Sequence, residues 1–265
     1  MKMIRFIIIL LTVFICSTIE VHAAERQKDP DEIVKDFLPV NSELVKAEEP
    51  VGTKAIQRYD FDSDGQAELI VTFKEKDQLK AMVLKKESGQ WKKVWEVTGE
   101  GFDIHYSGLE DMDGNGAKEY LIGWMIGASA GNELEIFQWQ NGSLHKLNDT
   151  IPYHKLETLN EGKQTYLAVW QRFCCDAYTV EVLKWNGTKF IQDDKMFMMY
   201  YPKIKAFYEE KISKMDAWYY WYALADAQVK ANLLQEAVLS IEKGLTLDPD
   251  NEQLLKLKKK LELGE

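Results

Sequence analysis

Apolar and polar residues alternate along the middle of this chain, and their spacing changes toward its C-terminal end. Between residues 52 and 198, short alternating runs rich in β-branched and aromatic residues are separated by turns that contain Gly, which is typical of antiparallel strands. From about Tyr200 the apolar residues recur every three or four positions, as in amphipathic helices. The pattern predicts an α+β protein with a module of antiparallel β-hairpins followed by an α-helical segment.

The predicted β-module is internally repetitive. Aligning Asp60 with Asp111 extends the similarity over a loop, two strands joined as a hairpin, a turn and a third strand, and a third copy follows. The Asn-Gly pairs at 141–142 and 186–187 are strong hairpin signals. The strands expected are 68–74, 79–85 and 91–97 in the first unit, 119–125, 134–139 and 144–147 in the second, and 165–170, 178–185 and 190–191 in the third.

Two similar acidic loops open the first two units. Each carries oxygen-bearing side chains at positions 1, 3, 5 and 9 and a Gly at position 6. Alternate residues of a tight loop can direct several oxygens at one Ca²⁺, and Gly permits the left-handed turn that this requires. The predicted Ca²⁺ ligands are Asp60, Asp62, Asp64, the carbonyl of Gln66 and Glu68 in the first loop, and Asp111, Asp113, Asn115, the carbonyl of Ala117 and Glu119 in the second.

These loops differ from EF-hand loops, which have a Glu at position 12 and continue into a helix, because Val71 and Ile122 occupy that position and strand-forming residues follow. The first loop has four acidic ligands against three in the second, so by charge count it is expected to bind Ca²⁺ more tightly. The alternative is a pair of Asp/Gly turns that bind nothing. The third unit is predicted to retain a vestigial loop, with Glu157, Leu159, Glu161 and Thr165 at the ligand positions.

The Asp-x-Asp-x-Asp-Gly-x-x-Glu-Leu pattern at Asp60, opening a β-hairpin unit, resembles the FG-GAP or VCBS-type repeats of integrin-like β-propellers and bacterial surface proteins. The resemblance covers roughly residues 52–195. It implies loops that bind calcium and tie neighbouring strands together. Closed propellers usually have about four to eight blades, and only three units are recognisable here. An open, twisted stack of three propeller-blade-like units is therefore expected rather than a closed ring.

The helical region at 199–265 resembles a single tetratricopeptide repeat over residues 218–250, through Trp221, Leu224, Ala225, Ala237 and Pro249. One such unit needs neighbours to bury its apolar faces, and helices at 203–214 and 251–263 are expected to supply them. The resemblance implies binding of a peptide or protein partner. The alternative is a packing element or a dimer contact.

The first residues resemble a secretory leader. Lys2 and Arg5 precede an apolar run from Phe6 to Ile15, and Val21-His22-Ala23 forms a small-residue cleavage site. We expect a cleaved signal peptide at 1–23, a helical or extended lead-in at 24–51 and a secreted, extracellular or cell-wall-associated protein without a later membrane span. An uncleaved anchor and a lipidated Cys16 are the alternatives. The mature chain would keep only Cys174 and Cys175, expected as unpaired thiols.

The charge and the motifs narrow the function. The net charge of −10 argues against nucleic acid and anionic membranes as partners. The histidines are scattered and the chain lacks the common catalytic motifs, so no enzymatic activity is expected. An exported, calcium-stabilised interaction module is predicted, which binds a protein through the helices or through the rim of hairpin turns. The alternative is a module that binds carbohydrate, such as cell-wall polysaccharide, through Trp91, Trp95, Trp124 or Trp139.

Overall fold

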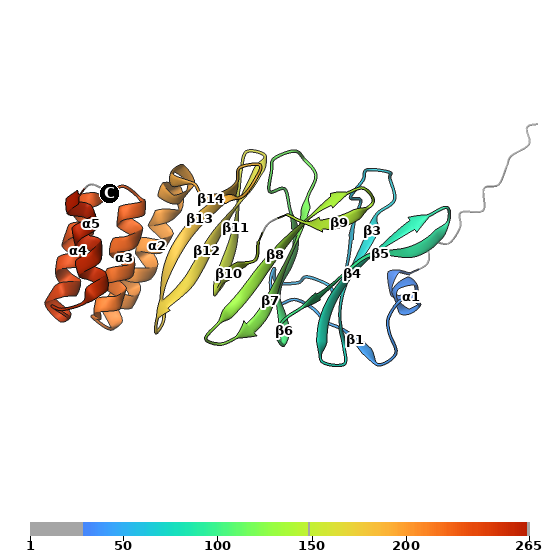
Figure 1. Ribbon diagram of the computed structural model, residues 1–265, viewed down its shortest axis with the longest axis horizontal. Coiled ribbons are helices and arrows are strands. Elements are labelled where there is room, and N and C mark those ends of the chain that lie inside the picture. Colours follow the sequence, from blue (N-terminus) through green and yellow to red (C-terminus); the bar gives the residue numbers. More distant parts are fainter. Residues whose placement is uncertain (1–28, 148, 264–265) are drawn as a thin grey trace, which may run out of the picture.

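The computed structural model describes residues 29–147 and 149–263 (Figure 1). The predicted leader at 1–23 and Cys16 lie outside these ranges. Three antiparallel sheets follow one another along the molecule, and four helices form the C-terminal end (Figure 1). The predicted α+β class, with hairpins first and helices last, is therefore confirmed.

The first and second sheets have five strands each and the third has four, and all the pairings between these strands are antiparallel. The first sheet consists of β1 (Ser42–Leu44), β2 (Ile56–Tyr59), β3 (Glu68–Glu75), β4 (Gln78–Glu87) and β5 (Gln90–Gly99). The second consists of β6 (Asp103–Glu110), β7 (Glu119–Gly127), β8 (Gly131–Gln140), β9 (Ser143–Lys146) and β10 (Ile151–Tyr153). The third consists of β11 (Lys155–Glu161), β12 (Gln164–Cys174), β13 (Ala177–Trp185) and β14 (Phe190–Gln192).

Local turn chemistry explains several of these connections. Asn141 and Gly142 join β8 to β9 with φ angles of 51° and 81°, and a type I′ hairpin turn needs positive φ at both central residues. Ser88 and Gly89 join β4 to β5 in the same way, with φ angles of 50° and 81°. The hairpin predicted at Asn141-Gly142 is confirmed, and Asn186-Gly187 also lies in a turn between two paired strands, β13 and β14.

Two sequence predictions about the units need correction. Each unit begins one strand earlier than expected, because β2, β6 and β11 precede β3, β7 and β12 and pair with them. The vestigial loop of the third unit is wrong, since Glu157 and Leu159 lie in β11, opposite Ala168 and Tyr166. With no acidic loop to insert, Glu161 pairs directly with Gln164 across a two-residue turn.

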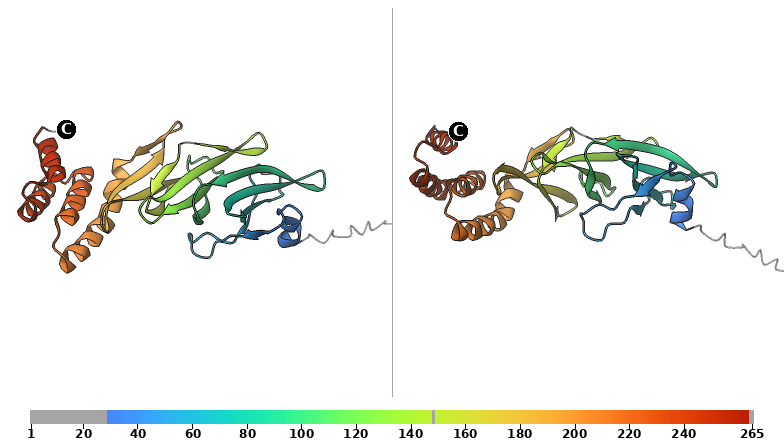
Figure 2. Two further views of the ribbon diagram at one scale, coloured as in Figure 1. Left: turned by 60° about the horizontal axis from the view of Figure 1, so that its bottom comes forward. Right: turned by 90° about the horizontal axis from the view of Figure 1, so that it is seen from below.

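Apolar side chains fill the space between successive layers. Ile70 and Val83 of the first sheet share a core with Ile122 of the second, and Leu121 of the second sheet shares another with Val169 of the third. Helix α1 (Pro30–Lys35) covers the outer face of the first sheet. The layers therefore form an open series within the described residues, as the two views of Figure 2 show.

The helices continue this series. The third sheet packs on α2 (Asp194–Lys214) and α3 (Trp218–Lys230), and α4 (Leu234–Leu247) and α5 (Glu252–Leu263) pack beyond α3. Helices α2, α3 and α5 occupy the predicted places, although α2 begins earlier than expected. None of the helices in residues 29–147 and 149–263 is long and apolar enough to cross a membrane.

Candidate metal centre

The two acidic loops lie at the same place in their sheets. Loop 1 (residues 60–67) joins β2 to β3, and loop 2 (residues 111–118) joins β6 to β7. Figure 1 shows both loops along the upper edge of the molecule, while the β3–β4, β7–β8 and β12–β13 hairpin turns lie along the lower edge. The loops and the predicted rim of hairpin turns are thus at opposite edges of the sheets.

The aspartate at position 1 organises each loop. The carboxylate of Asp60 accepts hydrogen bonds from the backbone N–H groups of Asp64 and Gly65, at 3.1 and 2.9 Å. The carboxylate of Asp111 accepts from the N–H groups of Gly114 and Gly116, at 2.8 and 2.9 Å. Gly65 and Gly116 have φ angles of 84° and 93°, so the left-handed turn predicted at position 6 is confirmed.

Position 2 anchors each loop in a core between sheets. Phe61 is buried between the first and second sheets, and Met112 is fully buried between the second and third. The backbone N–H of each residue donates a 2.8 Å hydrogen bond to the position-9 carboxylate, that of Glu68 or Glu119. The sequence analysis missed these two anchors, although a large apolar residue between two aspartates was a visible signal.

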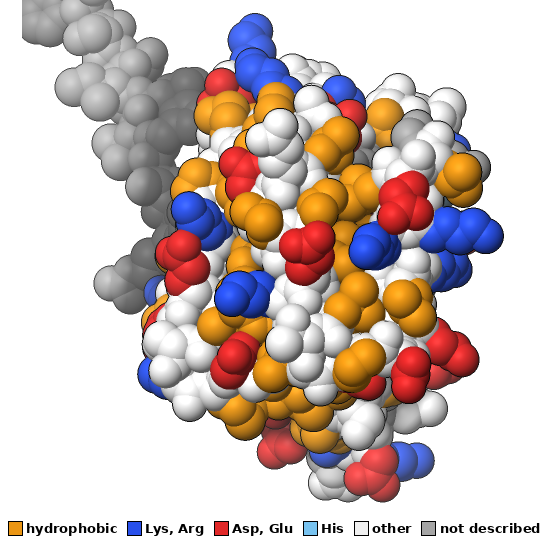
Figure 3. Space-filling model, turned by 90° about the vertical axis from the view of Figure 1, so that its left-hand side faces the viewer, with side chains coloured by type: hydrophobic (Ala, Val, Ile, Leu, Met, Phe, Trp, Pro, Cys, Tyr) orange, Lys and Arg blue, Asp and Glu red, His pale blue; other side chains and the backbone are white. Residues whose placement is uncertain are grey.

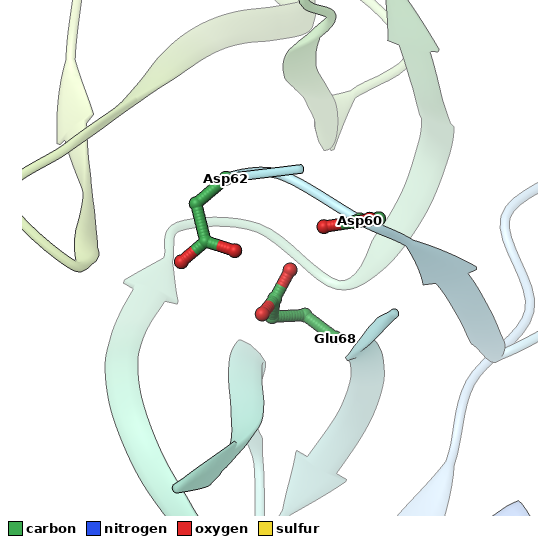
Figure 4. A group of neighbouring side chains, drawn as sticks. All are labelled: Asp60, Asp62 and Glu68. Atoms are coloured by element: carbon green, nitrogen blue, oxygen red, sulfur yellow. The ribbon is translucent and has the colours of Figure 1, made fainter. Parts of the chain in front are cut away.

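Three carboxylates converge in each loop. Ligand atoms of Asp60, Asp62 and Glu68 lie within 4.8 Å of one another, and those of Asp111, Asp113 and Glu119 do the same. Figure 4 shows the first group with its carboxylates turned toward one another. Six of the ten predicted ligands are therefore brought together, in two separate groups of three.

The remaining predicted ligands close the loops. Asp64 Oδ1 accepts from the N–H of Gln66 at 2.8 Å. The equivalent Asn115 Oδ1 accepts from the N–H of Ala117 at 2.6 Å. These bonds hold position 5 against position 7 in both loops, and the second oxygen of Asp64 accepts a 3.0 Å hydrogen bond from Lys85 Nζ.

The ammonium of Lys85 on β4 lies among the carboxylates of loop 1. Its Nζ donates to Asp62 at 2.6 Å, to Asp64 at 3.0 Å and to Glu68 at 2.9 Å. The side chain is 10% exposed and passes over the ring of Trp139. Burial lowers the pKa of Lys85, but the hydrogen bonds to the three carboxylates outweigh it and raise the pKa above its ordinary value.

A neutral side chain takes the corresponding place in loop 2. The amide Nε2 of Gln138 on β8 lies 3.2 Å from both Asp113 and Glu119. Within the described residues no lysine forms an ion pair with these carboxylates, and Glu119 is 1% exposed. Burial raises the pKa of Glu119 to about 7, and the nearby charges of Asp113 and Asp111 act in the same direction against the hydrogen bonds from Met112 and Gln138. In the described structure, the carboxylates of loop 2 are therefore not paired with a cation as those of loop 1 are with Lys85.

Both loops contact the neighbouring layer. The backbone N–H of Thr165 on β12 donates to the carbonyl of Asp111 at 2.8 Å, and Gln164 Nε2 donates to the carbonyl of Met112 at 2.8 Å. Phe61 of loop 1 stacks on Trp139 of the second sheet, with ring centroids 5.1 Å apart. Each loop thus lies across a junction between two sheets.

The tryptophans predicted to bind carbohydrate and the two adjacent cysteines lie outside the acidic loops. Trp124 is buried, while Trp91, Trp95 and Trp139 are half-buried. Cys174 and Cys175 carry free thiols, with their sulfur atoms 3.2 Å apart at the β12–β13 turn. The four tryptophans are packed against core residues and do not form a shared exposed platform.

Comparison of the chain with protein-family models and with curated proteins found no match.

Proposed function

We propose that this protein is an exported interaction module whose β-sheets are stabilised by Ca²⁺, and that it is related in design to FG-GAP or VCBS-type repeats. The observation that carries the proposal is the convergence of three carboxylates in each of two loops. Both loops contact the neighbouring sheet, so an ion that orders a loop would also strengthen its contacts with the next layer. The acidic loops act as structural fasteners in this proposal, and the protein is not an enzyme.

The donor set of the loops suits a hard cation. Carboxylate and amide oxygens are the ligands that Ca²⁺ prefers. The ammonium of Lys85, which makes hydrogen bonds to three carboxylates of loop 1, shows that their oxygens can surround a positive charge. In loop 2, Asp111, Asp113, Asn115, Glu119 and the carbonyl of Ala117 would hold the ion, which would supply the charge that balances these carboxylates.

Calcium should then raise the thermal stability of the protein, because an ion that binds only the folded state stabilises it. We expect the melting temperature to be several degrees higher in millimolar calcium than in chelator. Asp111→Asn combined with Asp113→Asn should remove the part of the difference that loop 2 contributes. The control Asp77→Asn removes an exposed charge in the β3–β4 turn and should leave it intact. A melting temperature that does not respond to calcium would refute the proposal.

The partner surface is proposed at the helical end. Figure 3 shows hydrophobic side chains spread over this end of the molecule. They include Leu239 and Leu263, which are 63% and 60% exposed. An apolar groove between α4 and α5 is lined by Leu234, Val238, Ile241, Lys258, Leu261 and Glu262. This arrangement is in keeping with the resemblance to a tetratricopeptide repeat.

The occupant proposed for this groove is an amphipathic helix of a partner protein with acidic residues along its edge. Apolar grooves between helices receive such helices, and α5 carries four lysines at positions 256 and 258–260 that would attract acidic residues. Val238→Asp and Leu261→Asp should abolish capture of an acidic amphipathic peptide, whereas Met198→Asp, on the exposed face of α2, should not. Equal capture by all three variants would contradict this surface.

A second candidate function is carbohydrate binding next to loop 2. A polar cleft between the second and third sheets is lined by Asp113, Gln138, Gln140, Leu147, Gln164, Trp185, Asn186 and Gly187. Amide and carboxylate groups around an aromatic ring could bind the hydroxyl groups of a sugar. Binding to isolated cell-wall polysaccharide that is lost with Gln140→Ala would favour this function, and binding that survives Gln140→Ala would argue against it.

A further inference from the structure

The two loops present the same acidic group to different side chains, which lie on the second strand after each loop, β4 or β8. The pairs Leu69–Leu84 in the first sheet and Tyr120–Phe137 in the second are equivalent in register, and Lys85 and Gln138 are the next residues on β4 and β8. Both side chains reach the carboxylates of positions 3 and 9, at 2.6 and 2.9 Å for Lys85 and 3.2 Å for Gln138. They therefore occupy one structural position with different charges.

We propose that Lys85 is a built-in cation that replaces Ca²⁺ in loop 1, so that loop 2 is the calcium site of the protein. This inference rests on the proposed calcium function and assigns it to one loop. The junction between the first and second sheets would then be fastened without metal, and the junction between the second and third sheets would be fastened by calcium.

Geometry and charge support the exclusion of metal from loop 1. The Lys85 ammonium makes three hydrogen bonds to the carboxylates that would bind the ion. A Ca²⁺ ion there would have to displace it, and the ammonium would stay nearby as a like charge because the side chain is largely buried, with its Nζ 5.9 Å from the centroid of the Trp139 ring. Like charges this close repel strongly when water is largely excluded.

Gln138 does not oppose a cation in this way. It is neutral, and rotation of its amide exchanges the Nε2 donor for the Oε1 acceptor at nearly the same position. The side chain could therefore turn an oxygen toward an ion held by Asp113 and Glu119. The same position thus repels calcium in one unit and accepts it in the other.

The inference reverses the order expected from the sequence. Loop 1 has four acidic ligands and loop 2 has three, but Lys85 contributes a positive charge that the ligand count left out. With Lys85 included, the net charge of the two groups is equal, and the difference is that a cation already lies in loop 1.

Calcium titration of the whole protein by calorimetry tests the inference through the number of sites. The wild type should bind one Ca²⁺, Lys85→Gln should bind two, and Gln138→Lys should bind none. The melting temperature of Gln138→Lys should also stop responding to calcium. Circular dichroism of each variant shows whether it is folded, and the reciprocal pair keeps the test valid if one variant is unstable.

The outcomes separate the inference from the proposed function. Two sites in the wild type would overturn the role of Lys85 while leaving the calcium function in place. No site in the wild type but one in Lys85→Gln would refute the calcium function of the native protein and support the role of Lys85. A single wild-type site that is unchanged in both folded variants would overturn the inference.

Discussion

Loop 1 and loop 2 have the same backbone design and differ in how their charge is balanced. In both, an aspartate closes the loop, an apolar residue anchors it between sheets, and a buried glutamate accepts the N–H of that anchor. In loop 1 the glutamate also accepts a hydrogen bond from the ammonium of Lys85, and in loop 2 it accepts one from the amide of Gln138. The acidic loop pattern thus specifies the shape of the loop, while a residue on another strand sets the charge that its carboxylates contact.

The largest expected effect concerns what the two loops share. Phe61→Ala should lower the free energy of unfolding by about 3–5 kcal/mol and Met112→Ala by about 2–5 kcal/mol, because each leaves a cavity between sheets. Urea denaturation in chelator measures both. A loss below about 1 kcal/mol for either variant would show that this loop is not anchored in the core.

The next prediction separates the loops by charge. In chelator, Glu68→Gln should lower the free energy of unfolding by about 2–3 kcal/mol, because it removes one buried partner of Lys85. Glu119→Gln should change it by less than about 1 kcal/mol, because no cation is left unpaired. Denaturation of the two variants side by side gives the comparison, and equal losses would contradict the difference in charge balance.

The sequence could predict the shape of each loop, because that shape depends on neighbouring residues. It could not predict which side chain contacts the loop. The spacing of Asp60, Asp62 and Gly65 marks the loop shape, and alternation marks β3 and β4. The partner of the loop lies farther along the chain, because Lys85 is 17 residues after Glu68 and Gln138 is 19 residues after Glu119. The β7–β8 hairpin is two residues longer than β3–β4, so an alignment of the units at constant offset does not bring Lys85 and Gln138 together.

The strands that were missed have a related explanation. The four residues of β2 form too short a run to show alternation, and their place is set by pairing with β3. The residues of β11 contain oxygen-bearing side chains such as Glu157 and Glu161, whose spacing matches ligand positions of the two acidic loops. This spacing led to the wrong prediction of a vestigial loop. Only the pairing with β12 distinguishes this strand from a loop. Long-range pairing, which the sequence does not display, decided both cases.

A smaller effect is expected from pH. The pKa of Glu119 in the folded protein is about 7, above its ordinary value of 4.5. Because the pKa is higher in the folded state, the protonated form of Glu119 stabilises the fold. This contribution to the free energy of unfolding is fully present below about pH 4.5 and is lost as the pH rises through 7. In chelator, the wild type should lose on the order of 2 kcal/mol of stability relative to Glu119→Gln between these limits. Parallel denaturation curves at pH 5 and pH 8 measure the difference. A constant difference would show that Glu119 does not titrate in this range.

The smallest effect concerns a contact that joins the two loops. The hydroxyl of Tyr59, at the end of β2 and next to loop 1, accepts a 2.9 Å hydrogen bond from the backbone N–H of Lys118 in loop 2. Tyr59→Phe should lower the free energy of unfolding by about 0.5–1 kcal/mol, because the exposed N–H can bond to water instead. The loss should be larger in calcium than in chelator if the ion orders loop 2 and so strengthens this contact. An equal loss in both conditions, measured by urea denaturation, would show that the two loops are fastened independently and that calcium at one junction is not sensed at the other.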